Sequence, residues 1–445
     1  MQRSSGWIGI WIVIAALNMG MASSLPKTPG MPSAPAAGPS APSVYDQLYP
    51  SYAEFCAATQ IRKKPGFGLP VRGGVGGHGV LYLRGACRDK TVGYPRITLC
   101  DPVDGANGVE PGVGVSVNSD FQNVNWTAVD TKAFFLTGDL KPGERLDREA
   151  YVRARQKAVD IGVLKGIEFH PELFSQKLTG MSDFEFMLED TMGTDYAISF
   201  GRNLYCARLP VTRPMLSKMV DWLNEQNDQY YLTGKRYQWS GVKDNCTHTT
   251  HNAYHAADVW GREATNRFLL RQIFHIAVPS HNFVELMERG NRLPLEDPVA
   301  LYRDPSFRRS LLHEGWIPAQ HGVLAEVFPV IKDNDLYETD LGMLFLGPEG
   351  LLKRGRFKKI LGNTRMLDLE ENLRWYKARY EKALRTRQSV DSIFASAYVN
   401  EGAQDTLSDI DREDFALFHD AYYRQLAIQL RDAELKLQLF GRKTL

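Results

Sequence analysis

The chain has 445 residues, enough for two or three domains. Lys and Arg number 53 and Asp and Glu number 52, so the formal net charge of +1 lacks the basic excess of a nucleic-acid-binding protein. The mean hydropathy of −0.32 excludes a polytopic membrane protein. Five cysteines are too few for a miniature fold held together by disulfides.

The N-terminus has the features of a secretory signal over residues 1–22. Arg3 supplies a positive charge, and the apolar run from Trp7 to Leu17 is 11 residues long. Such a run suits the apolar core of a signal peptide and is short for a membrane span. The segment is therefore either cleaved after the small residues at 20–22 or retained as an anchor in the inner membrane.

Residues 23–43 contain six prolines among small residues and are expected to form an extended linker. A signal, a linker and a globular body together predict a bacterial envelope protein, either periplasmic or secreted. Disulfides persist in that compartment. An odd number of cysteines leaves at least one free thiol, and the pairing remains open among Cys56, Cys87, Cys100, Cys206 and Cys246.

The body divides into a catalytic region, 44–290, and a mainly helical region, 291–445. Turn residues punctuate the first part, and Thr212 followed by Pro214 marks a helix start. The expected strands are 80–83, 96–99, 114–117 and a strand pair within 196–209; the expected helices are 147–165, 182–191, one from 212, and one from 245 or 246 to about 260.

After residue 290 the apolar residues recur every three or four positions, which predicts amphipathic helices over 365–397 and 412–440. A basic run precedes them. It is either a solvated loop or a contact site for anionic lipid headgroups, and its cations are Lys353, Arg354, Arg356, Lys358 and Lys359.

Residues 74–79 match the glycine pattern of dinucleotide-binding sites letter for letter. Such a site needs a strand before the glycines and a helix after them. Here prolines and glycines precede the pattern, and a predicted strand follows it. We therefore reject a nucleotide site and expect the glycines to bring the backbone close to His78.

The chemistry centres on Cys246, which is expected at a helix N-terminus. The helix dipole and free N–H groups there lower a thiol pKa and can hold a developing oxyanion. On a regular helix His248, His251 and His255 lie on the face opposite Cys246, so the general base should come from the sheet. His78, at the start of a strand, is the best placed.

These motifs resemble the circularly permuted branch of the NlpC-type, papain-like cysteine enzymes. Residues 77–83 (Gly-His-Gly-Val-Leu-Tyr-Leu) supply the strand histidine, and residues 244–248 (Asp-Asn-Cys-Thr-His) are similar to the Asn-Cys-x-His of lecithin:retinol acyltransferase-like proteins. The order of elements is most similar to the bacterial envelope family called domain of unknown function 4105. The resemblance covers about residues 67–290 and implies an α+β fold, a permuted papain-like core with an antiparallel sheet packed on the cysteine helix, plus a C-terminal helical region.

The resemblance also implies roles. Cys246 would be the nucleophile and His78 the base, while Tyr237 and Asn245 would contact the substrate or the oxyanion. Tyr237, with Trp239 and Gly241, resembles the lead-in of NlpC-type peptidases, although Ser240 replaces that motif's first glycine. The residue that orients His78 is not identified; the options are Thr98, Ser116 and Asn118.

The function expected is cysteine-dependent acyl transfer through a thioester. Water as acceptor gives an amidase, peptidase or esterase acting on cell-wall peptide. An amine acceptor gives a lipid or lipoprotein N-acyltransferase. Some members of the unknown-function family resemble lipoprotein N-acyltransferases. We expect no cofactor. Two other classes remain: a metal-dependent hydrolase using His248, His251 and His255 as ligands, and a non-catalytic envelope protein.

Overall fold

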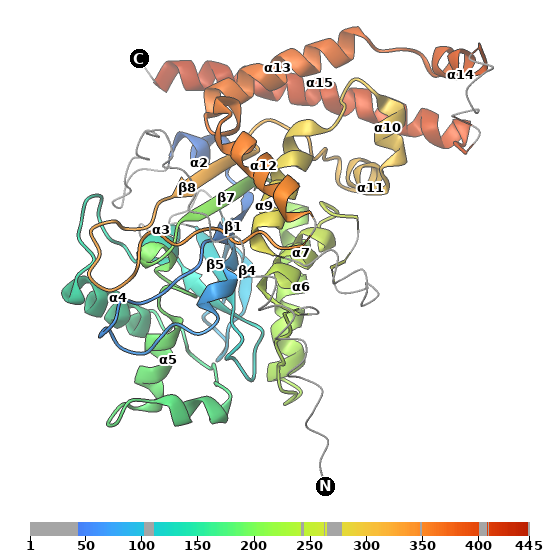
Figure 1. The fold of residues 1–445 in the computed structure, drawn as a ribbon. Helices are drawn as coiled ribbons and strands as arrows, with labels where there is room; N and C mark the ends of the chain where they lie inside the picture. The colour runs from blue at the N-terminus through green and yellow to red at the C-terminus, as the bar shows by residue number, and fades with distance from the viewer. Residues whose placement is uncertain are drawn as a thin grey trace.

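The computed structural model describes residues 43–101, 111–241, 244–261, 263–264, 278–347, 349–399, 407 and 409–443. The expected signal, 1–22, and all of the expected linker except Ser43 lie outside the described residues. The fold is mixed α+β, as predicted: an antiparallel sheet with helices on both faces is followed by a C-terminal helical region (Figure 1).

The main sheet has six antiparallel strands in the order β6-β5-β2-β1-β7-β8. A separate hairpin of β3 and β4 lies beside it. The strands are β1 (Tyr52–Ala58), β2 (His78–Arg84), β3 (Ala86–Arg88), β4 (Ile97–Leu99), β5 (Gly112–Val117), β6 (Trp126–Asp130), β7 (Leu204–Pro210) and β8 (Leu324–Phe328). Helices cover both faces, which is why all residues of β1, β2 and β5 are buried.

The described helices are α2 (Val44–Leu48), α3 (Lys132–Thr137), α4 (Arg148–Asp160), α5 (Asp183–Thr191), α6 (Arg213–Tyr231), α7 (Cys246–Ala256), α9 (Pro279–Arg292), α10 (Pro298–Arg303), α11 (Pro305–Glu314), α12 (Gly350–Leu361), α13 (Leu369–Arg385), α14 (Val390–Val399) and α15 (Arg412–Lys443). Short 3₁₀ turns are η1 (Gly74–Gly76), η3 (Pro171–Gln176), η4 (Ile198–Phe200) and η5 (Thr364–Met366). Thr212 caps α6 and Pro214 lies in its first turn, as predicted.

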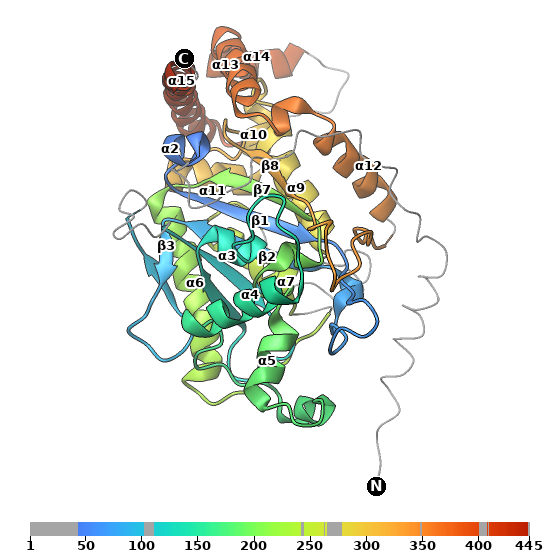
Figure 2. The same cartoon turned by 90° about the vertical axis from the view of Figure 1, so that its left-hand side faces the viewer.

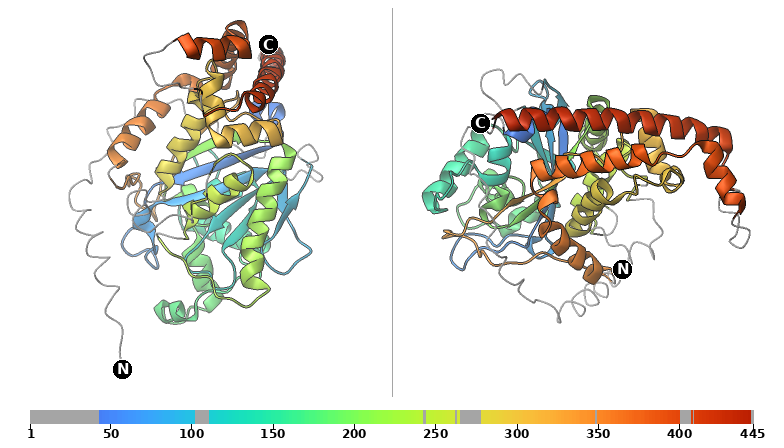
Figure 3. Two further views of the ribbon diagram at one scale, coloured as in Figure 1. Left: turned by 90° about the vertical axis from the view of Figure 1, so that its right-hand side faces the viewer. Right: turned by 90° about the horizontal axis from the view of Figure 1, so that it is seen from above.

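Strand parity assigns the helices to the two faces of the sheet. Gly79 approaches Pro279 of α9, whereas Gly114 lies under the Phe135 ring of α3. These two glycines belong to opposite faces because Gly114 pairs with Tyr82, which alternates with Gly79 along β2. Helices α7 and α9 therefore cover one face and α3 the other; α6 packs on α7 (Figure 3, left).

The C-terminal region has its own hydrophobic core. Helices α13 and α15 of this region lie side by side (Figure 3, right). Most of the predicted apolar stripes are buried there, including Leu373, Tyr376 and Tyr380 on α13 and Phe415, Phe418, Tyr422 and Leu426 on α15. The remaining predicted members, Leu367, Leu384 and Leu430, are half-buried. Across the described chain, no helix combines the length and apolar composition that crossing a bilayer requires.

Some predictions of elements were wrong. The stretch 196–209 holds one strand, β7, because Ala197 turns the chain with a φ of 50° into η4. The helix expected over 365–397 is broken between α13 and α14, where the Thr386 hydroxyl hydrogen bonds back to the Lys382 carbonyl. Strand β8 comes from the region expected to be helical, and it extends the main sheet beyond β7.

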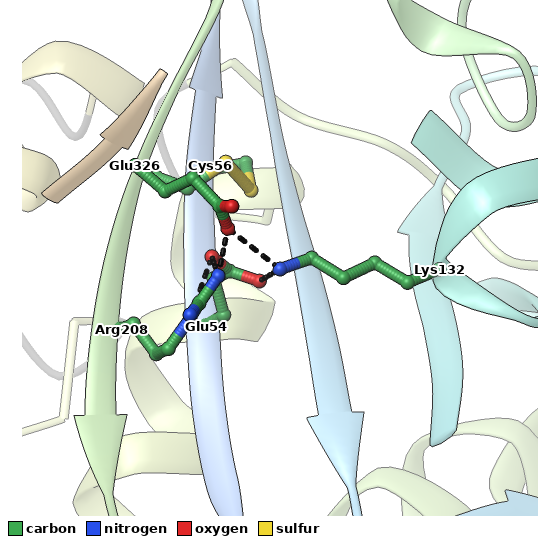
Figure 4. The surroundings of a disulfide bond; sticks show 6 residues. Glu54, Cys56, Lys132, Arg208 and Glu326 are labelled. Atoms are coloured by element: carbon green, nitrogen blue, oxygen red, sulfur yellow. Dashed lines mark hydrogen bonds and ion pairs between the residues drawn. A yellow bond between two sulfur atoms is a disulfide. The ribbon is translucent and has the colours of Figure 1, made fainter. Parts of the chain in front are cut away.

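Two disulfides join Cys56 to Cys206, on β1 and β7, and Cys87 to Cys100, in the small hairpin region. Charged side chains surround the first one (Figure 4). Glu54 is fully buried and lies 2.6 Å from Lys132 Nζ and 3.2 Å from the Arg208 guanidinium, and Glu326 pairs with both cations. The two cations compensate the negative charge of the buried Glu54, so the cluster has a structural role on the α3 face.

The basic run lies on α12 and is not a loop. Lys353 is buried and pairs with Glu285 at 2.8 Å, and Arg356 pairs with Glu288 at 3.0 Å. Arg354 is half-buried, whereas Lys358 and Lys359 are exposed. Only part of the predicted cationic set therefore faces solvent.

Candidate active site

Cys246 is the first residue of α7, as the sequence predicts. Asn245 is the N-cap: its side-chain oxygen accepts hydrogen bonds from the N–H groups of Thr247 at 2.8 Å and His248 at 3.1 Å. The Asn245 amide nitrogen donates to the Gly241 carbonyl at 2.9 Å, which fixes the preceding loop to the helix start. Of the cysteines, Cys246 is the free one, and it is half-buried.

The expected low pKa of the Cys246 thiol was wrong. Burial raises the pKa above its ordinary value, and this effect outweighs the hydrogen bonds from Gly79 and Thr247 and the charge of Arg202, which all lower it. The helix terminus does favour the thiolate locally, but removal from water costs more. The resting site therefore holds a neutral thiol.

His78 opens β2 and belongs to a hydrogen-bonded relay. Its Nε2 lies 2.9 Å from the Ser116 hydroxyl, and Ser116 donates to the Asp195 carboxylate at 2.6 Å. Asn118 donates to the other oxygen of Asp195, also at 2.6 Å. Ser116 and Asn118 were two of the three residues proposed to orient His78. Ser116 contacts the imidazole directly, and Asn118 contacts Asp195 but not the imidazole. Thr98 lies in the separate hairpin.

This relay fixes which nitrogen of His78 carries the proton. While Asp195 is ionised, it accepts the single hydrogen of the Ser116 hydroxyl, so Ser116 accepts from His78 Nε2–H. The neutral imidazole then carries its lone pair on Nδ1. Burial and Arg202 lower the pKa of His78 to about 3, so the ring is neutral at physiological pH.

The thiol and the imidazole approach the same end of β2 from different sides. The His78 side chain lies on the α3 face with Ser116, and α7 packs on the other face. Strand β5 pairs with β2 as far as Val80 and Ser116, and beyond that pair the backbone of Gly79 hydrogen bonds to the Cys246 thiol. Gly79 directly follows His78, but the described contacts contain no direct hydrogen bond between the thiol and the imidazole ring.

Arg202 is buried beside the end of the sheet where His78 lies. Its Nε donates to the Gly193 carbonyl and its Nη1 to the Thr59 carbonyl, both at 3.1 Å. Thr59 directly follows Ala58, the residue paired with His78, and Gly193 precedes Asp195 by two residues. Burial lowers the pKa of Arg202 to about 10, which keeps it cationic, and its charge acts on Cys246, His78 and Asp195.

Tyr237 is buried next to the thiol. Burial raises the pKa of its phenol, and the charge of Asp244 raises it further. Its hydroxyl makes no hydrogen bond of ordinary geometry within the described chain, and Asn125 is its polar neighbour. An unsatisfied hydroxyl beside a nucleophile is suited to bind a substrate oxygen.

Asn245 is occupied by its cap, so its side chain is not available to an oxyanion without breaking the helix start. The cap uses the N–H groups of Thr247 and His248. The backbone N–H of Cys246 accordingly becomes the better oxyanion donor at this helix terminus.

The histidine triplet of α7 is engaged elsewhere. His251 stacks on the Trp260 ring with a centroid distance of 4.0 Å, and His255 Nδ1 lies 2.7 Å from the Trp260 carbonyl. His248 is buried. Among the described residues, no group of three or more His, Cys, Asp or Glu side chains is arranged to hold a metal ion.

Sequence reasoning missed Asp195 and Arg202. Both lie in the segment between α5 and β7, about 80 residues from Ser116 along the chain and more than 100 from His78, and neither belongs to a motif of recognisable spacing. The pairing of β1 with β7 brings Arg202 to Thr59, and the hydrogen bonds from Ser116 and Asn118 hold Asp195. Comparisons of the chain with protein-family models, with curated proteins and with solved structures find no match.

Proposed function

We propose that the protein is a cell-envelope enzyme that transfers acyl groups through a thioester on Cys246. The observation that carries this proposal is the free thiol at a helix N-terminus beside the end of β2, where His78 is held by Ser116 and Asp195. A base oriented by a second polar group is the arrangement that nucleophilic catalysis needs. Two disulfides support an oxidising compartment.

In the proposed mechanism, Cys246 Sγ attacks the carbonyl carbon of an amide or ester as its proton passes around the end of β2 to His78 Nδ1. Because the resting thiol is neutral, proton transfer accompanies attack and no thiolate is stored beforehand. The tetrahedral oxyanion binds the Cys246 N–H and the Tyr237 hydroxyl. The carbon–leaving-group bond then breaks, His78 returns the proton to the leaving group, and a thioester remains.

The second half-reaction decides the product. An acceptor bound at the thioester loses its proton to His78 and attacks the thioester carbon, and the sulfur leaves as the thiol after taking the proton back from His78. Water as acceptor makes the enzyme a hydrolase of amides, esters or cell-wall peptide. An amine makes it an N-acyltransferase of lipid or lipoprotein. The exposed leucines of α12, Leu351 and Leu352, favour the lipid substrate.

The test is direct trapping of the acyl-enzyme with a p-nitrophenyl ester. We expect stoichiometric nitrophenol release and an acyl group on the Cys246 peptide. We expect His78→Gln to slow acylation by about 10²-fold or more. A matched control is His281→Gln, which changes a buried histidine on α9 outside the relay. An acyl group on another residue, or none in the wild type, would refute the proposal.

A further inference from the structure

We propose that the exposed face of α12 docks on an anionic lipid bilayer and holds the Cys246 end of the sheet close to it. This position favours a lipid-linked acyl group as substrate, and that assignment rests on the proposed function. The docking itself does not depend on the proposed function. Figure 2 shows α12 at the outside of the molecule.

The exposed face of α12 is both apolar and cationic. Leu351 and Leu352 are 65% and 66% exposed, and Lys358 and Lys359 lie on the same side about two turns further along the helix. The opposite side, with Phe357 and Ile360, is buried against the core. Exposed leucines can enter the headgroup region of a bilayer while neighbouring lysines meet lipid phosphates.

The cations of this face are available to a partner. Lys353 and Arg356 are paired with glutamates of α9, but no acid of the described chain pairs with Lys358 or Lys359. Charge complementarity therefore selects an anionic occupant. The adjacent leucines favour a bilayer over a soluble anion, because a free phosphate would leave them in water.

A chain of contacts joins α12 to the catalytic end of the sheet. The half-buried segment 343–346 runs into the helix, with the Phe345 backbone 3.2 Å from the position of a Cβ on Gly350. Gln60 connects this segment to the glycine-rich loop before His78: its N–H donates to the Gly342 carbonyl at 3.2 Å and its side chain to the Val75 carbonyl at 2.7 Å. Val75 is 71% exposed.

The same segment is tied to the thiol. Ser280 donates to the Leu344 carbonyl at 2.6 Å, and its neighbour Pro279 lies 3.5 Å from the position of a Cβ on Gly79. Gly79 hydrogen bonds to the Cys246 thiol. A bilayer that receives Leu351 and Leu352 would thus lie close to the site that accepts an acyl chain.

The experiment is hydrogen exchange of the full chain with and without vesicles containing phosphatidylglycerol, compared with phosphatidylcholine vesicles. We expect slower exchange over 343–361 with the anionic vesicles but not with the phosphatidylcholine vesicles. This protection should not depend on whether the N-terminal segment also contacts the membrane. Leu351→Glu with Leu352→Glu should abolish this protection. Lys358→Glu with Lys359→Glu should weaken docking by about fivefold or more for each lysine.

The matched control is Leu417→Glu with Leu435→Glu, which changes two exposed leucines of α15. This control should keep the protection. Unchanged exchange over 343–361 with bound vesicles, or equal loss in the α15 control, would overturn the docking proposal. Cys246→Ala should dock normally, so failure of the catalytic proposal and failure of docking are distinguished.

Discussion

At the scale of single residues, the direction of hydrogen bonding along His78, Ser116 and Asp195 determines whether the site has a base. Ionised Asp195 accepts from Ser116 and so leaves the lone pair of His78 on Nδ1. A protonated Asp195 would donate to Ser116, Ser116 would donate to Nε2, and the imidazole proton would move to Nδ1. The base would then be lost although His78 itself stays neutral.

Burial raises the pKa of Asp195 to about 7, so this reversal should occur near neutral pH. The rate of Cys246 acylation should be high above pH 7 and should decrease as the pH falls below 7. The decrease should be steeper than ionisation of the thiol alone explains. Asp195→Asn keeps an acceptor for Ser116 and cannot titrate, so its profile should lack the break. The measurement is the rate of p-nitrophenyl ester acylation from pH 5 to 9, and a break retained near pH 7 in Asp195→Asn would exclude this role.

Arg202 is the second decisive residue, because its charge lowers the pKa of the thiol and of His78. Arg202→Gln should raise the apparent thiol pKa, and Arg202→Lys should restore part of the shift. The readout is the pH dependence of iodoacetamide alkylation, which loss of a purely structural contact would not shift. An unchanged pH midpoint in Arg202→Gln would contradict this electrostatic role.

At the scale of elements, the start of α7 depends on the Asn245 cap. Asn245→Ala should cost about 1 kcal/mol of the free energy of unfolding, whereas Asn245→Asp keeps an acceptor for the N–H groups of Thr247 and His248. Urea denaturation measures both. Equal stability of the alanine and wild-type proteins would show that the backbone pairing of Ser240 with Asp244 is sufficient to order the helix start.

Elements with local signals were predictable from the sequence. Thr212 and Asn245 cap helices as expected, and β2 and β5 contain the predicted cores of strands. Strand β1 was missed because it is buried on both faces and places Glu54 in its centre, so polar and apolar residues do not alternate. Strand β8 was missed because it pairs with β7 from a stretch surrounded by helices.

The candidate site was predictable in part for the same reason. Cys246 and His78 stand in short motifs, and Ser116 was one of three options for the third member. Asp195 and Arg202 could not be found, because their role comes from long-range packing and not from spacing. The pKa of the thiol also depends on burial, which the position at a helix start does not reveal.

At the scale of the whole molecule, the two disulfides close loops of different size. Cys56 and Cys206 are 150 residues apart, and Cys87 and Cys100 are 13 apart. Loop entropy predicts losses of about 5 and 3 kcal/mol when the bonds are removed. We therefore expect the Cys56→Ala, Cys206→Ala protein to unfold at lower urea than the Cys87→Ala, Cys100→Ala protein; the reverse order would show that strain or packing outweighs loop entropy.

The proposed function rests on one step, the transfer of a proton from the Cys246 thiol to the His78 base. The most direct measurement is iodoacetamide alkylation of the unreduced, folded protein from pH 5 to 10, with mapping of the labelled peptide, in the wild type, His78→Ala and the control His281→Ala. We predict that Cys246 alone is labelled, that its rate still rises at pH 9, and that His78→Ala slows it at pH 7.5 by about tenfold or more while His281→Ala does not. A Cys246 that stays unlabelled until the protein unfolds, or a rate indifferent to His78, would contradict the account.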